Sequence, residues 1–243
     1  MDNDLEDLLK DALKAYQNSE FNLAVKKYQK LRKLAPDDPD IHFGLGTAYY
    51  KLGQYHLAAT CLSEAITIKP NFVEAYNNLG GAYFKQAKYR QSVSAYTTAT
   101  TLKNASATTY ANLGDAYFNL SELDNALEAY NRAFDIDADL SQSLVGLSRV
   151  FIKKNDFQTA LKYTGKVIYA DPANADALAI LAYVCLQRGD LDEAIKNYSL
   201  STTMNPNFVE AYIGLSDCYR AKGRRYSAIV ALVKAFRALV QKG

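Results

Sequence analysis

The chain is poor in the side chains that most often carry chemistry. Its 243 residues include no tryptophan, two histidines and three cysteines. Cys61, Cys185 and Cys218 are scattered and form no C-x-x-C motif, which argues against a disulfide framework or a zinc site and favours a reducing compartment. His42 and His56 stand alone in different predicted environments, so they predict neither a metal site nor a catalytic triad.

Long apolar runs, linkers and a strong charge of one sign are also lacking. No stretch approaches the roughly 18 apolar residues of a membrane span, and the acidic start MDNDLEDLLK lacks the basic-then-apolar order of a signal peptide. The net charge of +2 gives no polyelectrolyte signal for nucleic acid. No cluster of proline or glycine marks a linker. We therefore predict one soluble, cytoplasmic array over residues 1–243, without membrane insertion or a nucleic acid partner.

The sequence does contain a strict internal period. The hexapeptide NFVEAY occurs at residues 71–76 and again at 207–212, which is a separation of 136 residues, or four times 34. Seven units align without insertion over residues 5–38, 39–72, 73–106, 107–140, 141–174, 175–208 and 209–242. We number the residues of each unit as places 1 to 34. Place 8 holds Ala12, Gly46, Gly80, Gly114, Ser148, Ala182 and Ser216, and place 20 holds Ala24, Ala58, Ser92, Ala126, Ala160, Ala194 and Ala228. Small residues therefore keep their phase along the whole chain.

Each unit has the pattern of two packed helices. Places 4, 7, 8 and 11 share one face of a first helix, and places 17, 20, 24 and 27 form a stripe on a second helix. The small residues allow the two helices to approach closely. Proline near place 32, at Pro36, Pro70, Pro172 and Pro206, ends the second helix. Asn104 and Ala138 replace this proline at two junctions, which predicts softer or more continuous connections there.

In these places the sequence resembles the tetratricopeptide repeat family. The third unit carries the family signature as Tyr76, Leu79, Gly80, Tyr83, Ser92, Tyr96 and Ala99. The resemblance extends from residue 5 to about residue 242. It implies an all-α fold, a right-handed superhelical α-solenoid of seven tandem helix-turn-helix repeats, in which the first helices line a concave groove.

No motif predicts catalysis. GLGTAY at residues 44–49 and LGGAY at residues 79–83 lack a preceding strand, a third spaced glycine and a P-loop lysine. Helix packing explains these glycines better than nucleotide binding does. We predict that the protein is not an enzyme and uses no cofactor or metal.

The family resemblance implies that places 2, 5, 6, 9, 12 and 13 of the first helices face the groove. Place 12 is mostly aromatic. These side chains could bind apolar side chains of a ligand in the groove, or they could pack between successive first helices. Asn78 and Asn112 at place 6 resemble a short piece of the asparagine ladder of O-linked N-acetylglucosamine transferases, although asparagine is equally explained as tolerated on an open helix face. The candidate groove residues are Tyr50, Asn77, Asn78, Gly81, Phe84, Lys85, Asn112, Asp115, Phe118, Asn119 and Arg149.

Two further features bear on the ligand of this groove. Gly44, Gly146 and Gly214, also at place 6, are expected to leave room for a ligand to come close. Place 2 is largely acidic, for example at Asp40 and Glu74, which favours a protein or peptide ligand with some basic character.

The last predicted helix is apolar around more of its surface than one buried face requires, and no polar capping helix follows it. Either the chain was cut from a longer protein or this end meets a partner, such as another copy. Seven basic and two acidic residues lie within residues 209–243. The candidate assembly surface is Arg224, Arg225, Val233, Phe236, Leu239 and Val240.

These observations leave three functional hypotheses. The leading one is a non-catalytic scaffold that binds a peptide or protein segment in the concave groove. The second is the substrate-recruiting arm of a larger enzyme, similar to that of O-linked N-acetylglucosamine transferases. The third is a self-assembling structural protein, a homo-oligomer joined through its ends.

Overall fold

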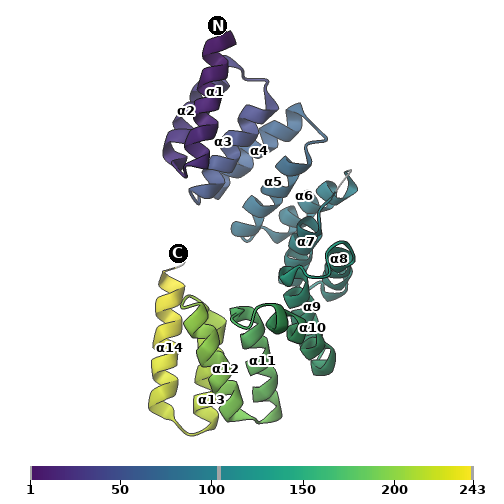
Figure 1. The fold of residues 1–243 in the computed structure, drawn as a ribbon, viewed down its shortest axis with the longest axis vertical. Coiled ribbons are helices and arrows are strands. Elements are labelled where there is room, and N and C mark those ends of the chain that lie inside the picture. The colour runs from purple at the N-terminus through teal and green to yellow at the C-terminus, as the bar shows by residue number, and fades with distance from the viewer. Residues whose placement is uncertain (1, 103–104, 242–243) are drawn as a thin grey trace. The chain divides into compact units, whose positions relative to one another are not determined.

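The computed structural model describes residues 2–102 and 105–241, and by its internal contacts the chain divides into two compact units, Met1–Ile136 and Asp137–Gly243. The division falls at the junction that contains Ala138, while Asn104 lies outside the described residues. Every regular element within the described ranges is an α-helix (Figure 1). None of the described helices has the length and apolar character needed to cross a membrane.

The first unit is built from consecutive antiparallel helix pairs that lie side by side (Figure 1). Its helices are α1 (Asp2–Gln17), α2 (Phe21–Leu34), α3 (Pro39–Lys51), α4 (Tyr55–Ile68), α5 (Val73–Lys85), α6 (Tyr89–Thr101), α7 (Ala107–Asn119) and α8 (Leu123–Ile136). From α3 onward, each odd-numbered helix begins at place 1 of a 34-residue unit.

The second unit continues the same pattern. Its helices are α9 (Ser141–Lys153), α10 (Phe157–Ala170), α11 (Ala175–Arg188), α12 (Leu191–Met204), α13 (Val209–Ala221) and α14 (Arg225–Val240). In both units each second helix contacts its own first helix and the first helix that follows it within the unit. The chain is thus an all-α solenoid of tandem helix-turn-helix repeats.

Side-chain caps fix where several helices begin. The Asp38 carboxylate accepts a hydrogen bond from the backbone N–H of Asp40, 2.9 Å away, and Pro39 supplies the preset φ of a first helical residue. Ser106 and Asn174 cap α7 and α11 in the same way. These caps satisfy N–H groups that have no partner inside the helix.

A left-handed residue joins the two helices of every repeat. At place 15 the backbone has positive φ at Ser19, Gly53, Ala87, Ser121, Asn155, Gly189 and Gly223. The following residue donates its N–H to the carbonyl at place 11, as Lys88 does to Tyr83 over 2.9 Å. This closure satisfies carbonyl groups at the end of the first helix. The period therefore exists in the backbone even where the residue type varies.

The core is a layer of small residues interleaved with large side chains at place 24. All seven residues at place 20 are buried, and six of them are fully buried. The rings of Tyr28, Tyr96, Tyr130 and Tyr198 are at most 4% exposed and lie against Gly44, Gly80, Gly114 and Gly214 respectively. Gly44 and Gly214 were expected to leave room for a ligand, but that space is filled by a tyrosine of the preceding repeat. Leu79 and Gly80 are buried packing residues, as predicted.

The first repeat departs from the repeat pattern at place 7 of its first helix. Asp11 occupies place 7, where all six later repeats carry leucine, and its side chain is exposed. Lys27 donates to its carboxylate over 2.6 Å, and this hydrogen bond, followed by the charge of Lys27, lowers the pKa of Asp11. The ion pair replaces an apolar contact at this position.

All three cysteines are unpaired. Cys61 and Cys218 are buried, and burial raises the pKa of each thiol to about 11. Burial also raises the pKa of the half-buried Cys185, with help from nearby carboxylates. A buried thiol behaves as a small apolar side chain, and a raised pKa keeps it in the poorly reactive protonated form at neutral pH.

Exchanging residue types at place 15 should change stability in opposite directions. Ala87→Gly relieves the cost of a left-handed alanine and should stabilise the first unit by about 0.5–1 kcal/mol. Gly53→Ala should destabilise it by about 1 kcal/mol, and because no atom lies within 4 Å of the added Cβ, only the backbone can be responsible. Urea unfolding followed by far-UV circular dichroism measures both changes. Shifts of the same sign would show that backbone conformation does not control this position.

The packing of tyrosine on glycine can be tested in the second unit. A Cβ on Gly214 overlaps the buried ring of Tyr198, so Gly214→Ala should destabilise the unit by about 1–3 kcal/mol. The matched control is Gly165→Ala, also inside a helix but with no atom within 4 Å of the new Cβ, which should stabilise by up to about 1 kcal/mol. Urea unfolding distinguishes the two, and equal stabilisation would contradict the packing account.

Candidate functional site

A small pocket lies among the first helices of the first unit. Its volume is about 270 Å³, and residues from α3, α5, α6 and α7 line it. The lining residues are Tyr50, Gly81, Phe84, Lys85, Tyr96, Asn112 and Asp115, and we refer to them as the groove pocket. Six of these seven are candidate groove residues from the sequence. Three successive repeats therefore contribute to one hollow.

The aromatic walls of the groove pocket are held by their own repeats. Tyr50 meets Tyr55 edge to face with 5.3 Å between ring centroids, and Phe84 meets Tyr89 in the same way at 5.3 Å. Tyr16 at place 12 makes the equivalent contact with Phe21. Three of the four aromatic rings at place 12 therefore pack against place 17 of their own second helix, a contact that neither sequence interpretation anticipated. Such ring pairs fix the orientation of the walls.

Two phenol groups flank the floor of the groove pocket at Gly81. A Cβ built on Gly81 would lie 3.4 Å from the hydroxyl oxygen of Tyr50 and 3.5 Å from that of Tyr96, which are ordinary contact distances. A tyrosine hydroxyl is neutral at pH 7, and burial raises the pKa of both tyrosines further, so each keeps a proton to donate. Tyr96 was missed from the sequence as a pocket residue, because its place 24 marks a core position.

The remaining lining residues are polar. The Tyr130 hydroxyl donates to the Asp115 carboxylate over 2.6 Å, which holds this acid in position. Asn112 is half-buried, and Lys85 is exposed. The groove pocket thus offers aromatic surface together with an amide, a carboxylate, an ammonium group and two phenols. Groups of these kinds bind a ligand non-covalently and orient it.

The other candidate groove residues lie outside this pocket. Asn78 donates to the Thr47 hydroxyl over 3.3 Å, so part of its amide is used between repeats, and the structure does not bring it into the same hollow as Asn112. The Asn77 Oδ1 atom is buried and has no hydrogen-bond partner among the described residues. Asn119 donates to the carbonyl of Asp115 over 2.8 Å, and Phe118 is half-buried on the same helix. Arg149 is exposed on α9 of the second unit.

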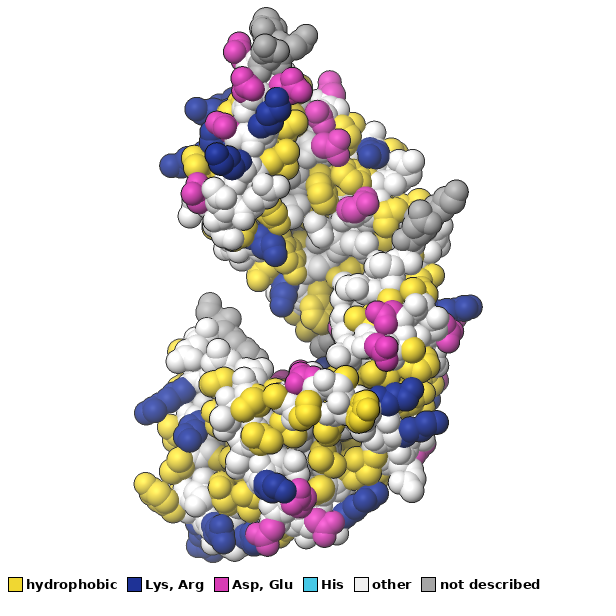
Figure 2. Space-filling model, viewed as in Figure 1, with side chains coloured by type: hydrophobic (Ala, Val, Ile, Leu, Met, Phe, Trp, Pro, Cys, Tyr) yellow, Lys and Arg dark blue, Asp and Glu magenta, His cyan; other side chains and the backbone are white. Residues whose placement is uncertain are grey.

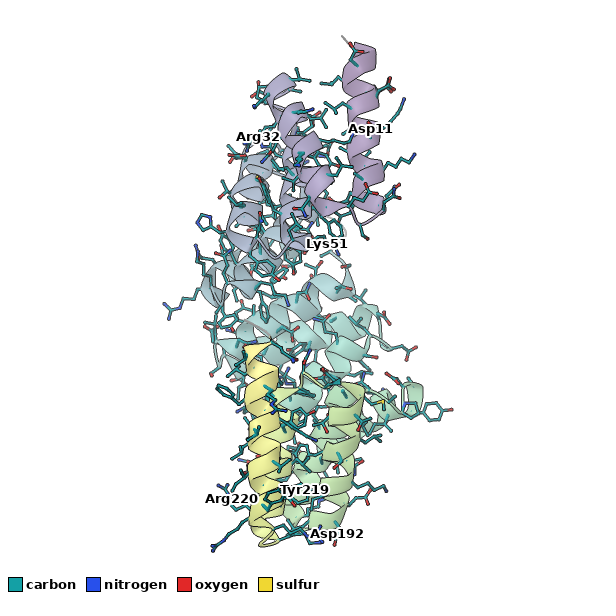
Figure 3. All side chains as sticks on the ribbon, turned by 90° about the vertical axis from the view of Figure 1, so that its left-hand side faces the viewer. Asp11, Arg32, Lys51, Asp192, Tyr219 and Arg220 are labelled. Atoms are coloured by element: carbon teal, nitrogen blue, oxygen red, sulfur yellow. The ribbon has the colours of Figure 1, made fainter. Side chains whose placement is uncertain are left out.

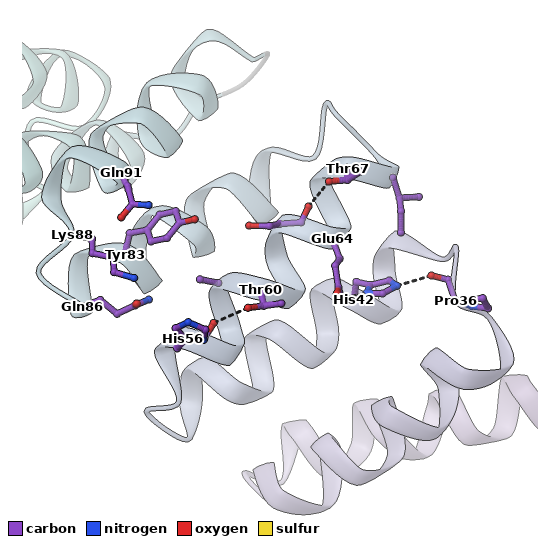
Figure 4. Close-up of a pocket in the computed structure, with 13 residues that line it drawn as sticks. Pro36, His42, His56, Thr60, Glu64, Thr67, Tyr83, Gln86, Lys88 and Gln91 are labelled. Atoms are coloured by element: carbon purple, nitrogen blue, oxygen red, sulfur yellow. Dashed lines mark hydrogen bonds and ion pairs between the residues drawn. The ribbon is translucent and has the colours of Figure 1, made fainter.

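A larger hollow of about 600 Å³ brings both histidines to its wall (Figure 4). The His42 ring is already engaged, since Nδ1 lies 2.9 Å from a Glu64 carboxylate oxygen and Nε2 lies 2.6 Å from the carbonyl oxygen of Pro36. The Thr60 hydroxyl donates a hydrogen bond to the backbone carbonyl of His56 over 3.2 Å. Within the described ranges, no three His, Cys, Asp or Glu residues are arranged to hold a metal ion. His42 therefore serves as a packed and hydrogen-bonded link between repeats.

Comparisons with known families agree with the repeat pattern. A family model described as TPR repeat matches residues 12–53 and 46–87. Three further models described as tetratricopeptide repeat match residues 73–106, 107–140 and 151–200. Together these ranges cover residues 12–140 and 151–200. A comparison with curated proteins gives no significant match.

Solved structures share the fold at low sequence identity. A chain of the crystal structure of the APC/C hetero-tetramer Cut9-Hcn1 matches with a TM-score of 0.75 and 19% identity over 89% of this chain, which spans 45% of that chain. Pseudomonas aeruginosa PilF matches with a TM-score of 0.71 and 17% identity, covering 86% of this chain and 96% of that one. YrrB, described as a TPR protein with an unusual peptide-binding site, matches with a TM-score of 0.61 and 15% identity, covering 77% of this chain and 97% of that one.

At such identities these structures show the fold alone, whereas the family models match most of the sequence directly. The helix pairs, the small residues at places 8 and 20 and the matched ranges agree with one another. The chain belongs to the tetratricopeptide repeat family.

Proposed function

We propose that this protein is a non-catalytic interaction scaffold that binds an extended protein segment across the groove pocket of its first unit. Tetratricopeptide repeats support protein interaction in general. The observation that carries the finer proposal is the pocket itself, to which the first helices α3, α5 and α7 and the second helix α6 contribute. A segment lying across successive first helices would meet every one of these side chains. YrrB, which shares the fold, is described as having a peptide-binding site.

The lining suggests which kind of side chain enters. Tyr50 and Phe84 offer aromatic surface to an apolar stem, and Asp115 offers a carboxylate to a polar or cationic head. Residues 107–140, which include Asp115, contain one basic and seven acidic residues. We therefore expect a segment with basic character, whose arginine or lysine stem lies between the rings. Exposed Lys85 would favour an acidic or carbonyl group of the segment beside it.

Binding should also involve the backbone of the segment. Gly81 leaves the floor open, and the two neutral phenols beside it can donate hydrogen bonds to a peptide carbonyl. The Asn112 carboxamide can donate to and accept from one peptide group. Asn78, whose amide donates to Thr47, lies outside this pocket and is not needed for the proposal. We also propose a cytoplasmic location, for which the three unpaired cysteines are the support.

Filling the floor of the groove pocket should weaken binding without unfolding the chain. The probe is a peptide selected from a random library displayed on phage against the whole chain. Gly81→Leu places its side chain where the segment would lie and should raise the Kd of this peptide at least about tenfold. Asn112→Ala should raise it about fivefold to tenfold through the loss of a hydrogen bond. Isothermal titration calorimetry measures the affinities.

The control is Gly165→Ala, which changes an exposed helical glycine of the second unit and should leave the Kd unchanged. Asp115→Asn tests the charge of the ligand, because a basic segment should lose affinity and the salt dependence of its binding should fall. Unchanged binding to folded Gly81→Leu and Asn112→Ala would overturn the groove pocket as the site. A selected peptide that is acidic and binds Asp115→Asn more tightly would overturn the basic character.

A further inference from the structure

The last helix exposes places that the earlier repeats bury. At place 24 of α14, Leu232 is 49% exposed, whereas the residues at this place in the six earlier second helices are at most 4% exposed. Those residues are Tyr28, Leu62, Tyr96, Tyr130, Thr164 and Tyr198. Place 28 of α14 shows the same contrast, since Phe236 is 66% exposed while this place is half-buried or buried in α4, α6, α8, α10 and α12. The face that α14 exposes is the interhelix face of this repeat family.

The exposed residues form one continuous stripe. Ile229, Leu232, Phe236 and Leu239 follow one another at intervals of three, four and three residues, and each is at least 49% exposed. This spacing places them along one side of the helix with the a and d periodicity of a coiled coil. Val233 and Val240 widen the stripe. We call these six residues the α14 seam. Figure 3 shows α14 in front of the other helices of its unit, and Figure 2, viewed from a direction 90° away, shows many hydrophobic side chains on the face of this unit turned to the viewer.

The charged residues in the middle and last turns of α14 lie on other sides of the helix than the seam. At 100° per residue, Lys234 and Arg237 lie about 160° and 100° from Phe236 around the helix, while buried Ala228, Ala231, Ala235 and Ala238 face the protein's own core. The seam therefore carries no charge along its length until Arg225 at its amino-terminal end. Two copies of this seam can meet without bringing like charges together.

The amino-terminal helix α1 is a poor alternative partner. Its residues at places 3, 6, 7 and 10 are Asp7, Lys10, Asp11 and Lys14, and all four are exposed. Docking the seam against them would bury charged groups, including the Asp11–Lys27 ion pair, beside apolar side chains, and removing each ion from water costs on the order of several kcal/mol. The described exposed large hydrophobic residues are concentrated on α14. The seam therefore matches a second copy of itself better than it matches α1.

The direction of pairing follows from the helix ends. In a parallel pair the two Arg225 side chains would face each other and the helix dipoles would align. In an antiparallel pair each Arg225 would lie near the carboxyl end of the partner helix, where the unpaired carbonyl groups carry partial negative charge. If each Arg225 lies opposite Val240 of the partner helix, the two-fold axis passes the midpoint of α14 (Arg225–Val240). Leu232 then lies close to its own counterpart in the second copy.

We propose that the α14 seam pairs antiparallel with the α14 seam of a second copy to form a two-fold dimer. A single helix pair buries less than the roughly 800 Å² per partner of a standard interface. The dimer should therefore dissociate on dilution. This inference does not depend on the groove pocket, because the two surfaces lie on different units.

Sedimentation velocity of the whole chain, from micromolar to near-millimolar concentration, tests the dimer. We expect a concentration-dependent shift from monomer to dimer. Phe236→Glu should abolish the dimer, and its side chain is exposed enough for the fold to survive, which circular dichroism checks. The matched control is Tyr169→Glu on α10, a 92% exposed aromatic of the same unit, which should leave dimerisation unchanged. A monomer at every concentration, or a dimer that persists in Phe236→Glu, would overturn the proposal.

Disulfide crosslinking tests the direction of pairing. In a Cys185→Ser background, Leu232→Cys lies near the two-fold axis and should give a crosslinked dimer under mild oxidation, whereas Val240→Cys should not. In a parallel pair both positions would lie beside their own counterparts and both would crosslink. Crosslinking of Val240→Cys, or no crosslink at Leu232→Cys, would overturn the antiparallel arrangement.

Discussion

The structure depends on one recurring contact, in which the buried residue at place 24 of a second helix, most often tyrosine, packs against a glycine or another small residue of a first helix. Tyr130 is 1% exposed, and a Cβ on Gly114 would lie only 2.6 Å from its ring. Helices of 13 to 16 residues are marginal by themselves in water. Burying an aromatic ring between two such helices therefore supplies much of their stability. At Gly114 an added side chain would overlap this ring, so the ring or the helices would have to shift.

This contact also builds the candidate site. The ring of Tyr96 packs on Gly80 in the core layer, while its hydroxyl reaches the floor of the groove pocket beside Gly81. One residue thus belongs to both the core and the pocket. A ligand would meet walls whose positions are already fixed by packing, which limits the ordering entropy that binding must overcome. Places 6, 9 and 13 vary from repeat to repeat in this chain, with glycines, amides, charged residues and some apolar residues such as Ile180 and Tyr183.

The sequence predicts most of this fold because small residues and aromatics keep one period of 34. It also identifies six of the seven pocket residues, because a helix of known phase presents fixed places to the groove. The sequence does not predict Tyr96 as a pocket residue, because its place 24 is a core position and only the structure shows that its hydroxyl group also reaches the pocket. The sequence also does not predict the left-handed backbone at place 15. Only three of the seven repeats have glycine there, and the others have Ser19, Ala87, Ser121 and Asn155. The division at Asp137 falls where Ala138 replaces the expected proline, but the missing proline alone could not show that the contacts divide there, since Asn104 replaces the same proline at another junction.

A repeat covers its apolar interhelix face only by having a neighbour. Within the array the neighbour is the next first helix, and place 24 becomes core. On α14 the same places hold Leu232 and Phe236, and they remain exposed. A large apolar stripe in water favours association, and the direction of association is then decided by weaker forces. Here those forces are the helix dipole and Arg225, which oppose parallel pairing and favour antiparallel pairing. The periodic pattern that forms the core would thus also form the interface, with place 24 covered by a second molecule.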